Sequence, residues 1–452
     1  MEENIKENKM GVMPVKKLVI DMSLPIMISM LVQALYNVVD SIFVSMLGEA
    51  ALTAVTVAFP LQNLVISIAS GTGVGMNAIL SRSLGEKNQD KADQAAASGI
   101  FLAFVSMLVF FVLSFVVTDP FIHSQTTDSL IRQYGDTYLG IVTGFSVGAF
   151  FQVTFERLLQ STGRTRLSMI SQLTGAIFNI IFDPLLIFGI GPFPKLGVAG
   201  AAIATVLGQC VAACIGLYLN VHYNTELHFS LKRVMRPAGA IIAEIYAIGI
   251  PSILMMAIGS VMTYCMDLIL IAFSSTATAV FGVYFKLQSF FFMPIFGLNN
   301  GLIPMLAYNF GARKRIDETF AFAFKLAVVI MLIGTAVFEI FPEKLLQMFN
   351  ASDDMLRIGV PALRIIAIHF VIAAVDIVMG GGFQAFAMSI YSFFISLGRQ
   401  LVVLIPVAWL LAKTGNVNNV WWCFLIAEFA SFLMSTTFFR KLYRERIKPL
   451  AA

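Results

Sequence analysis

The sequence predicts an all-α polytopic membrane protein, with 12 transmembrane helices arranged as two pseudo-symmetric six-helix lobes. Three observations predict this fold class. Of the 452 residues, 58% are hydrophobic and only 12% are charged, whereas a soluble globular chain carries about 25% charged residues. Long apolar stretches recur along the whole chain. The second half of the sequence also repeats features of the first half, which predicts an internal duplication.

The apolar stretches are each long enough to cross a bilayer, for which a helix needs about 20 residues. The expected spans are 17–46, 51–80, 92–118, 133–159, 167–190, 197–221, 240–273, 277–307, 318–341, 359–384, 388–412 and 418–439. An even number of spans places both chain ends on one side of the membrane. Basic residues gather in the even-numbered loops and the tails, as at Lys232, Arg233 and Arg236. The positive-inside rule therefore predicts that both termini are cytoplasmic.

The internal duplication is visible as identical residues at one fixed offset. The matched pairs are Pro25 and Pro251, Leu61 and Leu287, Gln62 and Gln288, Gly71 and Gly297, Gly75 and Gly301, and Gly85 and Gly311. Each pair is 226 residues apart, which is half of the chain. Six helices per half is an even number, so both halves insert with the same orientation. Parallel repeats of this kind are typical of membrane transporters.

The longest polar connector separates the two halves and sets the expected domain division. The division is a cytoplasmic tail at 1–16, an N-lobe at 17–221, a cytoplasmic linker at 222–239, a C-lobe at 240–439 and a cytoplasmic tail at 440–452. The polar start of the chain has no apolar stretch behind a basic segment, so no cleaved signal peptide is expected.

Several functional classes are disfavoured by composition and motifs. The net charge of +4 comes from basic residues in short loops, so nucleic acid is not an expected partner. The sequence contains no HExxH motif and no glycine-rich phosphate loop, so neither a metal cofactor nor a nucleotide is expected. Cys210 and Cys214 share a helical face and are either a metal or redox pair or small buried hydrophobes. The second interpretation is favoured because free cysteine commonly behaves as a small hydrophobe.

The first span carries an aspartate, Asp40, inside an apolar stretch. Gln33, Tyr36 and Asn37 precede it by seven, four and three residues, so all four share one helical face. A charged residue at the centre of a membrane helix costs about 2.5–3.5 kcal/mol and usually faces the bundle interior or a water-filled cavity. This face is therefore expected to form one wall of a cation-coupled transport path.

A second intramembrane aspartate, Asp183, lies on the fifth span one turn after Asn179. Helical rise places Asp40 and Asp183 at a similar depth in the outer half of the membrane. Two neighbouring carboxylates in a low dielectric do not both ionise cheaply, so the pair suits proton exchange near neutral pH. Alternatively, their oxygens together with Asn179 and Thr205 surround Na⁺. In a third interpretation, each aspartate is a structural hydrogen-bond acceptor between helices.

The second half carries its own charged residues near the midplane. Asp376 and Arg399 lie on successive spans and are interpreted as a neutralising pair. Lys286 has no partner in its own helix, so it is expected to line the substrate cavity together with Asp376, to pair with that aspartate, or to respond electrostatically when the cavity fills.

With these residues in place, the chain resembles the MATE (multidrug and toxic compound extrusion) family over essentially all of its spans. The segments that carry the resemblance are LPIMISMLVQALYNVVDSIFVSMLG at 24–48, GTGVGMNAILSRSLGEKN at 71–88, NIIFDPLLIFG at 179–189 and GLNNGLIPMLAYNFGARK at 297–314. The resemblance implies a V-shaped pair of six-helix lobes that exports substrates by alternating access, driven by H⁺ or Na⁺.

Within that family the chain is most similar to the DinF-like branch, which depends on an aspartate at the position of Asp40. The stretch 252–260, SILMMAIGS, lacks the glutamate that the NorM-like branch carries early in its seventh helix. The resemblance therefore places the coupling site in the N-lobe. The positions that match residues lining the N-lobe cavity are Gln33, Tyr36, Asn37, Tyr138, Asn179, Asp183 and Thr205.

The expected function is export of organic, cationic and amphipathic compounds in exchange for H⁺ or Na⁺. The chain is expected to act as a monomer in the plasma membrane of a prokaryote, with small organic substrates and membrane lipids as its partners. The alternative is a flippase for lipids or lipid-linked oligosaccharides, which would call for a cationic cavity. An intramembrane enzyme is disfavoured because His369 has no partner on its own helix face.

Overall fold

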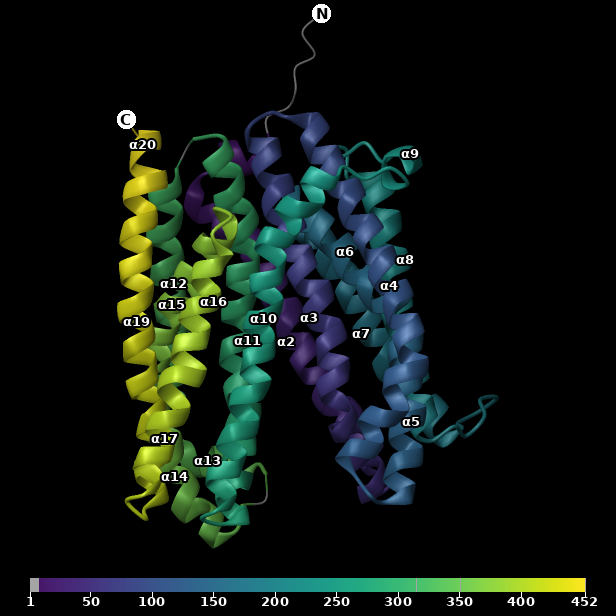
Figure 1. Ribbon diagram of the computed structural model, residues 1–452, viewed down its shortest axis with the longest axis vertical. Helices are drawn as coiled ribbons and strands as arrows, with labels where there is room; N and C mark the ends of the chain where they lie inside the picture. The colour runs from purple at the N-terminus through teal and green to yellow at the C-terminus, as the bar shows by residue number, and fades with distance from the viewer. Residues whose placement is uncertain (1–7, 314, 350, 452) are drawn as a thin grey trace, which may run out of the picture. The chain divides into compact units, whose positions relative to one another are not determined.

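The computed structural model describes residues 8–313, 315–349 and 351–451, and its regular secondary structure is helical throughout (Figure 1). Residues 1–7 and 452 of the predicted tails and Lys314 lie outside the described residues. The helices are α1 Lys9–Val12, α2 Val15–Ser45, α3 Glu49–Gly85, α4 Gln89–Gln125, α5 Ser129–Gly144, α6 Val147–Ser161, α7 Thr165–Phe188, α8 Val198–Tyr223, α9 Leu231–Val234, α10 Gly239–Ile271, α11 Ser275–Gly311, α12 Ile316–Ile340, α13 Pro342–Gln347, α14 Asp353–Ala367, α15 Phe370–Ala385, α16 Ser389–Leu397, α17 Ile405–Ala412, α18 Val417–Val420, α19 Trp422–Leu442 and α20 Lys448–Ala451, with π-helices η1 Gly398–Leu404 and η2 Tyr443–Ile447.

Membrane-spanning helices account for most of the described chain. Ten helices are long and apolar enough to cross a membrane, and the number rises to 12 if each of two bent pairs is one span. The bent pairs are α5 with α6, at 44°, and α14 with α15, at 48°. They correspond to the predicted spans 133–159 and 359–384, whose internal breaks the sequence analysis did not anticipate. The predicted all-α polytopic fold class is confirmed.

The chain forms two compact units whose borders lie inside helices. Unit 2 is Ile28–Ile253, and unit 1 combines Met1–Met27 with Leu254–Ala452. The first part of α2 therefore belongs to unit 1, while the first part of α10 belongs to unit 2. Met27 and Ile253 are 226 residues apart, which is the offset of the sequence repeat. In each half of the chain, the start of the first long helix thus belongs to a different unit from the rest of that half. The predicted lobes at 17–221 and 240–439 follow the sequence halves, and their boundaries stay a prediction.

The repeated glycines lie where the starts of α2 and α10 pack against neighbouring helices of the same unit. In unit 2, a Cβ on Gly75 of α3 would overlap the carbonyl oxygen of Ile245 in α10, so only glycine fits. In unit 1, a Cβ on Gly301 of α11 would lie 2.7 Å from Ser23 Oγ, and one on Gly297 would lie 2.6 Å from Met27 Cα. Non-bonded heavy atoms are optimally about 3.5–4.0 Å apart. Side chains at these glycines would therefore push the helices apart.

The repeat extends to helix ends and turn conformations. Helices α3 and α11 each have 37 residues and end at the matched glycines Gly85 and Gly311. Two residues later, Lys87 and Arg313 both adopt positive φ, at 57° and 53°. Positive φ is uncommon for residues other than glycine. Its presence at equivalent positions shows that the duplication is preserved in backbone geometry as well as in sequence.

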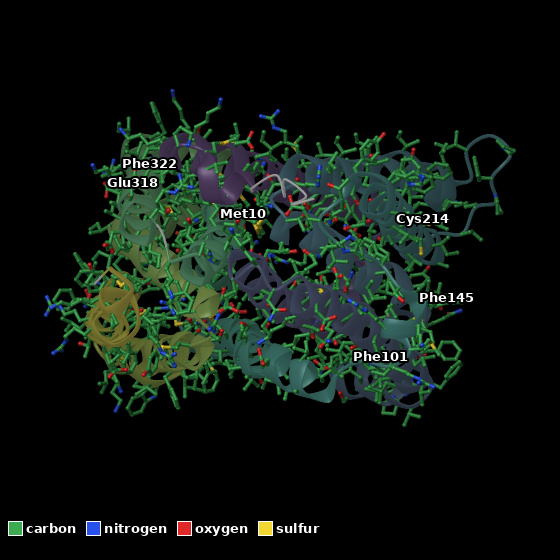
Figure 2. The ribbon with its side chains drawn as sticks, turned by 90° about the horizontal axis from the view of Figure 1, so that it is seen from above. Met10, Phe101, Phe145, Cys214, Glu318 and Phe322 are labelled. Carbon is green, nitrogen blue, oxygen red and sulfur yellow. The ribbon has the colours of Figure 1, made fainter. Side chains whose placement is uncertain are left out.

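The outward faces of the helices are apolar, as expected for a chain surrounded by lipid. Phe115 of α4 is 75% exposed, and Phe145, between α5 and α6, is 58% exposed. Phe145 and Cys214, which are labelled in Figure 2, both have exposed side chains. All four cysteines are free, and Cys214 is exposed. The interpretation of Cys210 and Cys214 as small buried hydrophobes is therefore wrong for Cys214, and Cys210 is only partly buried.

Candidate functional site

The candidate site of unit 2 rests on close packing between α7 and α8. Gly175 of α7 and Gly208 of α8 face each other, and a Cβ on Gly175 would lie 2.7 Å from the carbonyl oxygen of Gly208. The absence of side chains at this crossing brings the two backbones together. Asn179 and Asp183 of α7 are consequently packed against Thr205 of α8. All three side chains are buried, with Asp183 fully inaccessible to solvent.

Asp183 is linked to α8 through an asparagine. In the amide orientation that satisfies both of its groups, Asn179 donates from Nδ2 to Asp183 Oδ2 at 3.0 Å. Asn179 Oδ1 then accepts from the backbone N–H of Thr205 at 3.1 Å. Among the described residues, Asp183 Oδ1 is buried without a hydrogen-bond partner. A buried oxygen of this kind is costly to leave unsatisfied, so it is a natural position for a proton or a bound cation.

Asp40 of α2 completes the centre of the site. Its carboxyl group lies close enough to that of Asp183 for the two to interact. Two neighbouring carboxyl groups in a low dielectric do not both ionise cheaply. Asp40 Oδ1 is also buried without a partner in the described part of the chain. Within residues 8–313, 315–349 and 351–451, no lysine or arginine forms an ion pair with either aspartate. The pair therefore lacks a fixed positive charge.

Two tyrosines border the carboxyl pair. The Tyr36 side chain, one turn before Asp40, lies beside the Thr205 side chain. Tyr138 of α5 is buried and lies beside the side chain of Gln62 of α3. Both tyrosines lie close enough to Asp40 and Asp183 to interact with them electrostatically. Side chains from five helices thus meet at this polar cluster, which we call the Asp40–Asp183 site.

The remaining predicted residues of the N-terminal half are placed differently from one another. Gln33 accepts a hydrogen bond from Gln172 Nε2 of α7 at 2.9 Å. This bond adds a contact between α2 and α7 two helical turns before Asp40. Asn37 is exposed, although it neighbours Tyr36 in the sequence. The structure therefore brings together Asp40, Asp183, Asn179, Thr205, Tyr36 and Tyr138, connects Gln33 through Gln172, and leaves Asn37 at the surface.

Gln62 and Gln172 belong to this network, but the sequence analysis did not assign them to it. A signal existed for each. Gln62 is one of the repeat-matched residues, and Gln172 lies seven residues before Asn179 on the same face of α7.

Unit 1 contains a second buried charged cluster with a different composition. Arg399, in the π-helix η1, donates from Nη1 to Glu428 Oε2 of α19 at 3.0 Å. Glu428 is 3% exposed. Asp376 of α15 lies beside Ser431 and Ser435 of α19 and interacts electrostatically with both Arg399 and Glu428. We call these three residues the Arg399 cluster.

The Arg399 cluster corrects the interpretation of Asp376 and Arg399 as a neutralising pair. The direct ion pair of Arg399 is with Glu428, a residue that the sequence analysis did not single out, and Asp376 supplies a further carboxyl group. Lys286 is exposed on α11, and in the described part of the chain it forms no ion pair with Asp376. A search of the spans for every acidic residue would have found Glu428, because it lies inside the predicted span 418–439.

Taken together, the duplicated helical fold and the uncompensated intramembrane carboxyl groups define a class of protein, the secondary membrane transporter. The MatE family model matches residues 25–185 and 251–410. The two matches start 226 residues apart and so reproduce the duplication. The chain therefore belongs to the MATE (multidrug and toxic compound extrusion) family and is a multidrug-efflux-type membrane transporter, not an enzyme.

Similar proteins and structures agree with this assignment. The chain is 27% identical over 417 residues to the multidrug export protein MepA of Staphylococcus haemolyticus (strain JCSC1435), covering 91% of this chain and 90% of that protein. It is 28% identical over 419 residues to an FAD transporter of Shewanella oneidensis, with 90% of each chain covered. A solved structure described as the outward-facing conformation of a multidrug resistance MATE transporter matches with a TM-score of 0.92 and 24% identity over 100% of both chains. The fold is thus the MATE fold.

Proposed function

We propose that the protein exports small organic cations in exchange for protons, with the Asp40–Asp183 site as the place where proton and substrate binding are coupled. The observation that carries this proposal is the pair of neighbouring carboxyl groups, for which the described residues supply no basic partner. With one proton, the pair bears one negative charge and favours a cation nearby. With a second proton, that attraction disappears. Proton binding therefore has a direct electrostatic means of weakening the binding of a cationic substrate.

Transport follows if the two protonation states favour different conformations. A ligand shifts a conformational equilibrium only by its differential affinity for the two states. Protonation of the pair from outside changes the hydrogen bonds among α2, α7 and α8, which contain Asp40, Asp183 and Thr205. The site then releases the substrate outside, and the return to the inward-facing state carries the proton inside. This reciprocal coupling is the defining property of an antiporter.

Sodium is the alternative coupling ion. The oxygen atoms of Asp40, Asn179, Asp183 and Thr205 are of the hard type that Na⁺ prefers. The proton is favoured because two neighbouring carboxyl groups in a low dielectric do not both ionise cheaply, so one of them readily holds a proton.

The branch and the cellular setting belong to the same proposal. The aspartate at position 40 supports assignment to the DinF-like branch, and the absence of a glutamate in residues 252–260 supports it further. Bacterial relatives support a plasma-membrane location in a prokaryote, and the distribution of basic residues supports cytoplasmic termini. We propose that one chain, acting as a monomer among membrane lipids, is sufficient for transport, since unit 2 contains the complete Asp40–Asp183 site.

The proposal is tested with purified protein in liposomes loaded with ethidium, a fluorescent organic cation. We expect an external acid pH gradient to drive efflux and a Na⁺ gradient at constant pH to have no effect. Efflux driven by Na⁺ alone would replace the proton by Na⁺ at the same residues. FAD serves as a second cargo, because a relative is named an FAD transporter. Transport of FAD without any transport of ethidium would overturn the proposed substrate class.

A further inference from the structure

We propose that Asp119, His123 and Asp136 form a binding site for a divalent transition metal, with Zn²⁺ as the best-fitting ion, at the corner between α4 and α5. One ligand atom from each residue lies within 4.8 Å of the other two. Asp119 and His123 lie one turn apart on α4, and Asp136 comes from α5. Two ligands four residues apart on one helix, completed by a third ligand from elsewhere, is a recurrent arrangement for zinc.

The distances suit a tetrahedral ion. His123 Nε2 is 3.0 Å from Asp119 Oδ1 and 3.3 Å from Asp136 Oδ2. Nitrogen and oxygen ligands bind zinc at about 2.0–2.2 Å, so ligand atoms at tetrahedral angles lie about 3.3–3.5 Å apart. The two distances to His123 thus lie within about half an ångström of the tetrahedral value, and the ligand oxygens of Asp119 and Asp136 lie within 4.8 Å of each other. The three side chains are exposed by 70% at Asp119, 43% at His123 and 30% at Asp136, which leaves room for a water molecule as the fourth ligand.

A simple ion pair accounts for this arrangement less well. Both carboxylates approach the same ring nitrogen, Nε2, which carries one hydrogen in an imidazolium ion and so points at one oxygen only. The ligand oxygens of Asp119 and Asp136 also lie within 4.8 Å of each other, where two negative charges repel. A dication at the centre interacts favourably with all three groups, with histidine bound through Nε2 as neutral imidazole.

The neighbouring polar side chains are occupied elsewhere. Arg132 donates from Nε to the carbonyl oxygen of Thr126 at 2.7 Å and so holds the connector between α4 and α5. Asp128 caps α5 by accepting from the N–H groups of Leu130 and Ile131. Asp128 therefore stabilises the helix start, which leaves Asp119, His123 and Asp136 as the ligand set.

The location of the site determines where the ion comes from. Within unit 2, α9 and the linker at 222–239 that contains it lie at one end, and the corner between α4 and α5 lies at the other (Figure 1). Under the proposed topology this linker is cytoplasmic. The metal site therefore faces the outside and takes its ion from there.

Metal binding at this corner has a route to the transport site. Asp136 and Tyr138 are two residues apart on α5 and therefore lie on roughly opposite faces of it. Tyr138 faces the Asp40–Asp183 site. An ion that joins Asp136 to α4 restricts α5 and thus the position of Tyr138. This consequence for transport rests on the proposed function, whereas the metal site itself does not.

The experiment is calorimetric titration of Zn²⁺ into the full-length chain in detergent, after removal of any histidine tag. We expect one ion per chain, and we expect affinity to fall by at least about tenfold in Asp136→Asn and His123→Ala, in keeping with the effects of ligand-shell mutations. His222→Ala is the matched control, since His222 is an exposed histidine bonded to the carbonyl oxygen of Tyr218. Its affinity should equal that of the wild type.

Two outcomes would overturn the metal site: no zinc binding by the wild type, or equal binding by the wild type and His123→Ala. Asp119→Asn is a further variant that spares folding, because Asp119 is 70% exposed. A zinc-dependent rise in Tm for the wild type and His222→Ala, but not for Asp119→Asn, provides a second readout. Neither measurement involves transport, so failure of the proposed antiport would leave the result interpretable.

Discussion

The two units contain buried acidic clusters that differ in their charge balance. In unit 2, Asp40 and Asp183 lie close enough to interact, and no arginine or lysine pairs with them among the described residues. In unit 1, Asp376 and Glu428 accompany Arg399, which makes a 3.0 Å ion pair with Glu428. The charge of the first cluster depends on bound protons or cations, whereas the second cluster contains its own cation. The halves of a duplicated chain have therefore diverged, and the difference supports the proposal that ion coupling takes place in unit 2.

The largest expected effect on stability comes from replacing Arg399, the positively charged residue of the Arg399 cluster. Arg399→Met leaves Glu428 and Asp376 buried without their positive partner. Breaking a buried ion pair in this way costs about 3–5 kcal/mol. We expect a marked loss of Tm in detergent, measured by the fluorescence of the native tryptophans. The double variant Arg399→Met/Glu428→Leu should recover part of the loss, and no recovery would show that the ion pair is not the cause.

The next largest effect on stability is expected where the start of α10 packs against α3 in unit 2. Gly75→Val places a side chain against the carbonyl oxygen of Ile245, and overpacking of this kind costs about 1–3 kcal/mol. Gly282→Ala is the matched control, because no heavy atom lies within 4 Å of the added Cβ. In that exposed helix interior, alanine should stabilise the chain by about 0.5–1 kcal/mol. The measurement is thermal stability, and an equal loss in both variants would contradict the proposed crossing.

A smaller effect is expected at the edge of the Asp40–Asp183 site. Asn179→Ala removes the donor to Asp183 and leaves another carboxyl oxygen without a partner, which costs about 1–3 kcal/mol. Because the aspartates remain, the variant should retain proton-driven transport while its pH dependence shifts. The measurement is initial efflux rate against external pH. A pH profile that superimposes on that of the wild type would show that Asn179 has no influence on the carboxyl pair.

The smallest effect is expected at Lys286. Its side chain is exposed and makes no ion pair in the described residues, so Lys286→Gln should leave Tm and the driving ion unchanged. If Lys286 lines the substrate cavity, as the sequence predicts, the apparent KM for a cationic substrate should fall, because a like charge has been removed. A change in the ion that drives transport would contradict the assignment of coupling to unit 2.

Sequence reasoning identified the features that depend on composition and helical period. Asp40 and Asp183 are unusual in apolar spans, and one helical turn relates Asn179 to Asp183 and Tyr36 to Asp40, so these residues were recognised without coordinates. Repeated glycines likewise revealed the duplication. The family match confirms the class of transporter that these patterns indicated.

Features that depend on contacts between distant helices were not recognised in the same way. The roles of Gln62 and Gln172 depend on how α3 and α7 are rotated toward their neighbours. The partner of Arg399 depends on which acidic residue α19 presents to η1. The exchange of helix starts between units depends on long-range packing at Gly75 and Gly301, which no local pattern encodes. The breaks within the two bent pairs were missed because their apolar character continues across each bend.

The most direct measurement compares efflux of ethidium driven by an external acid pH gradient in the wild type, Asp40→Asn, Asp183→Asn and Asp267→Asn. Asp267 is a partly buried aspartate in the unit 1 part of α10 and serves as the matched control. We predict that Asp40→Asn and Asp183→Asn lose proton-driven efflux although they fold and still bind ethidium, while Asp267→Asn behaves like the wild type. Full proton-driven efflux by Asp40→Asn would contradict the assignment of coupling to the Asp40–Asp183 site.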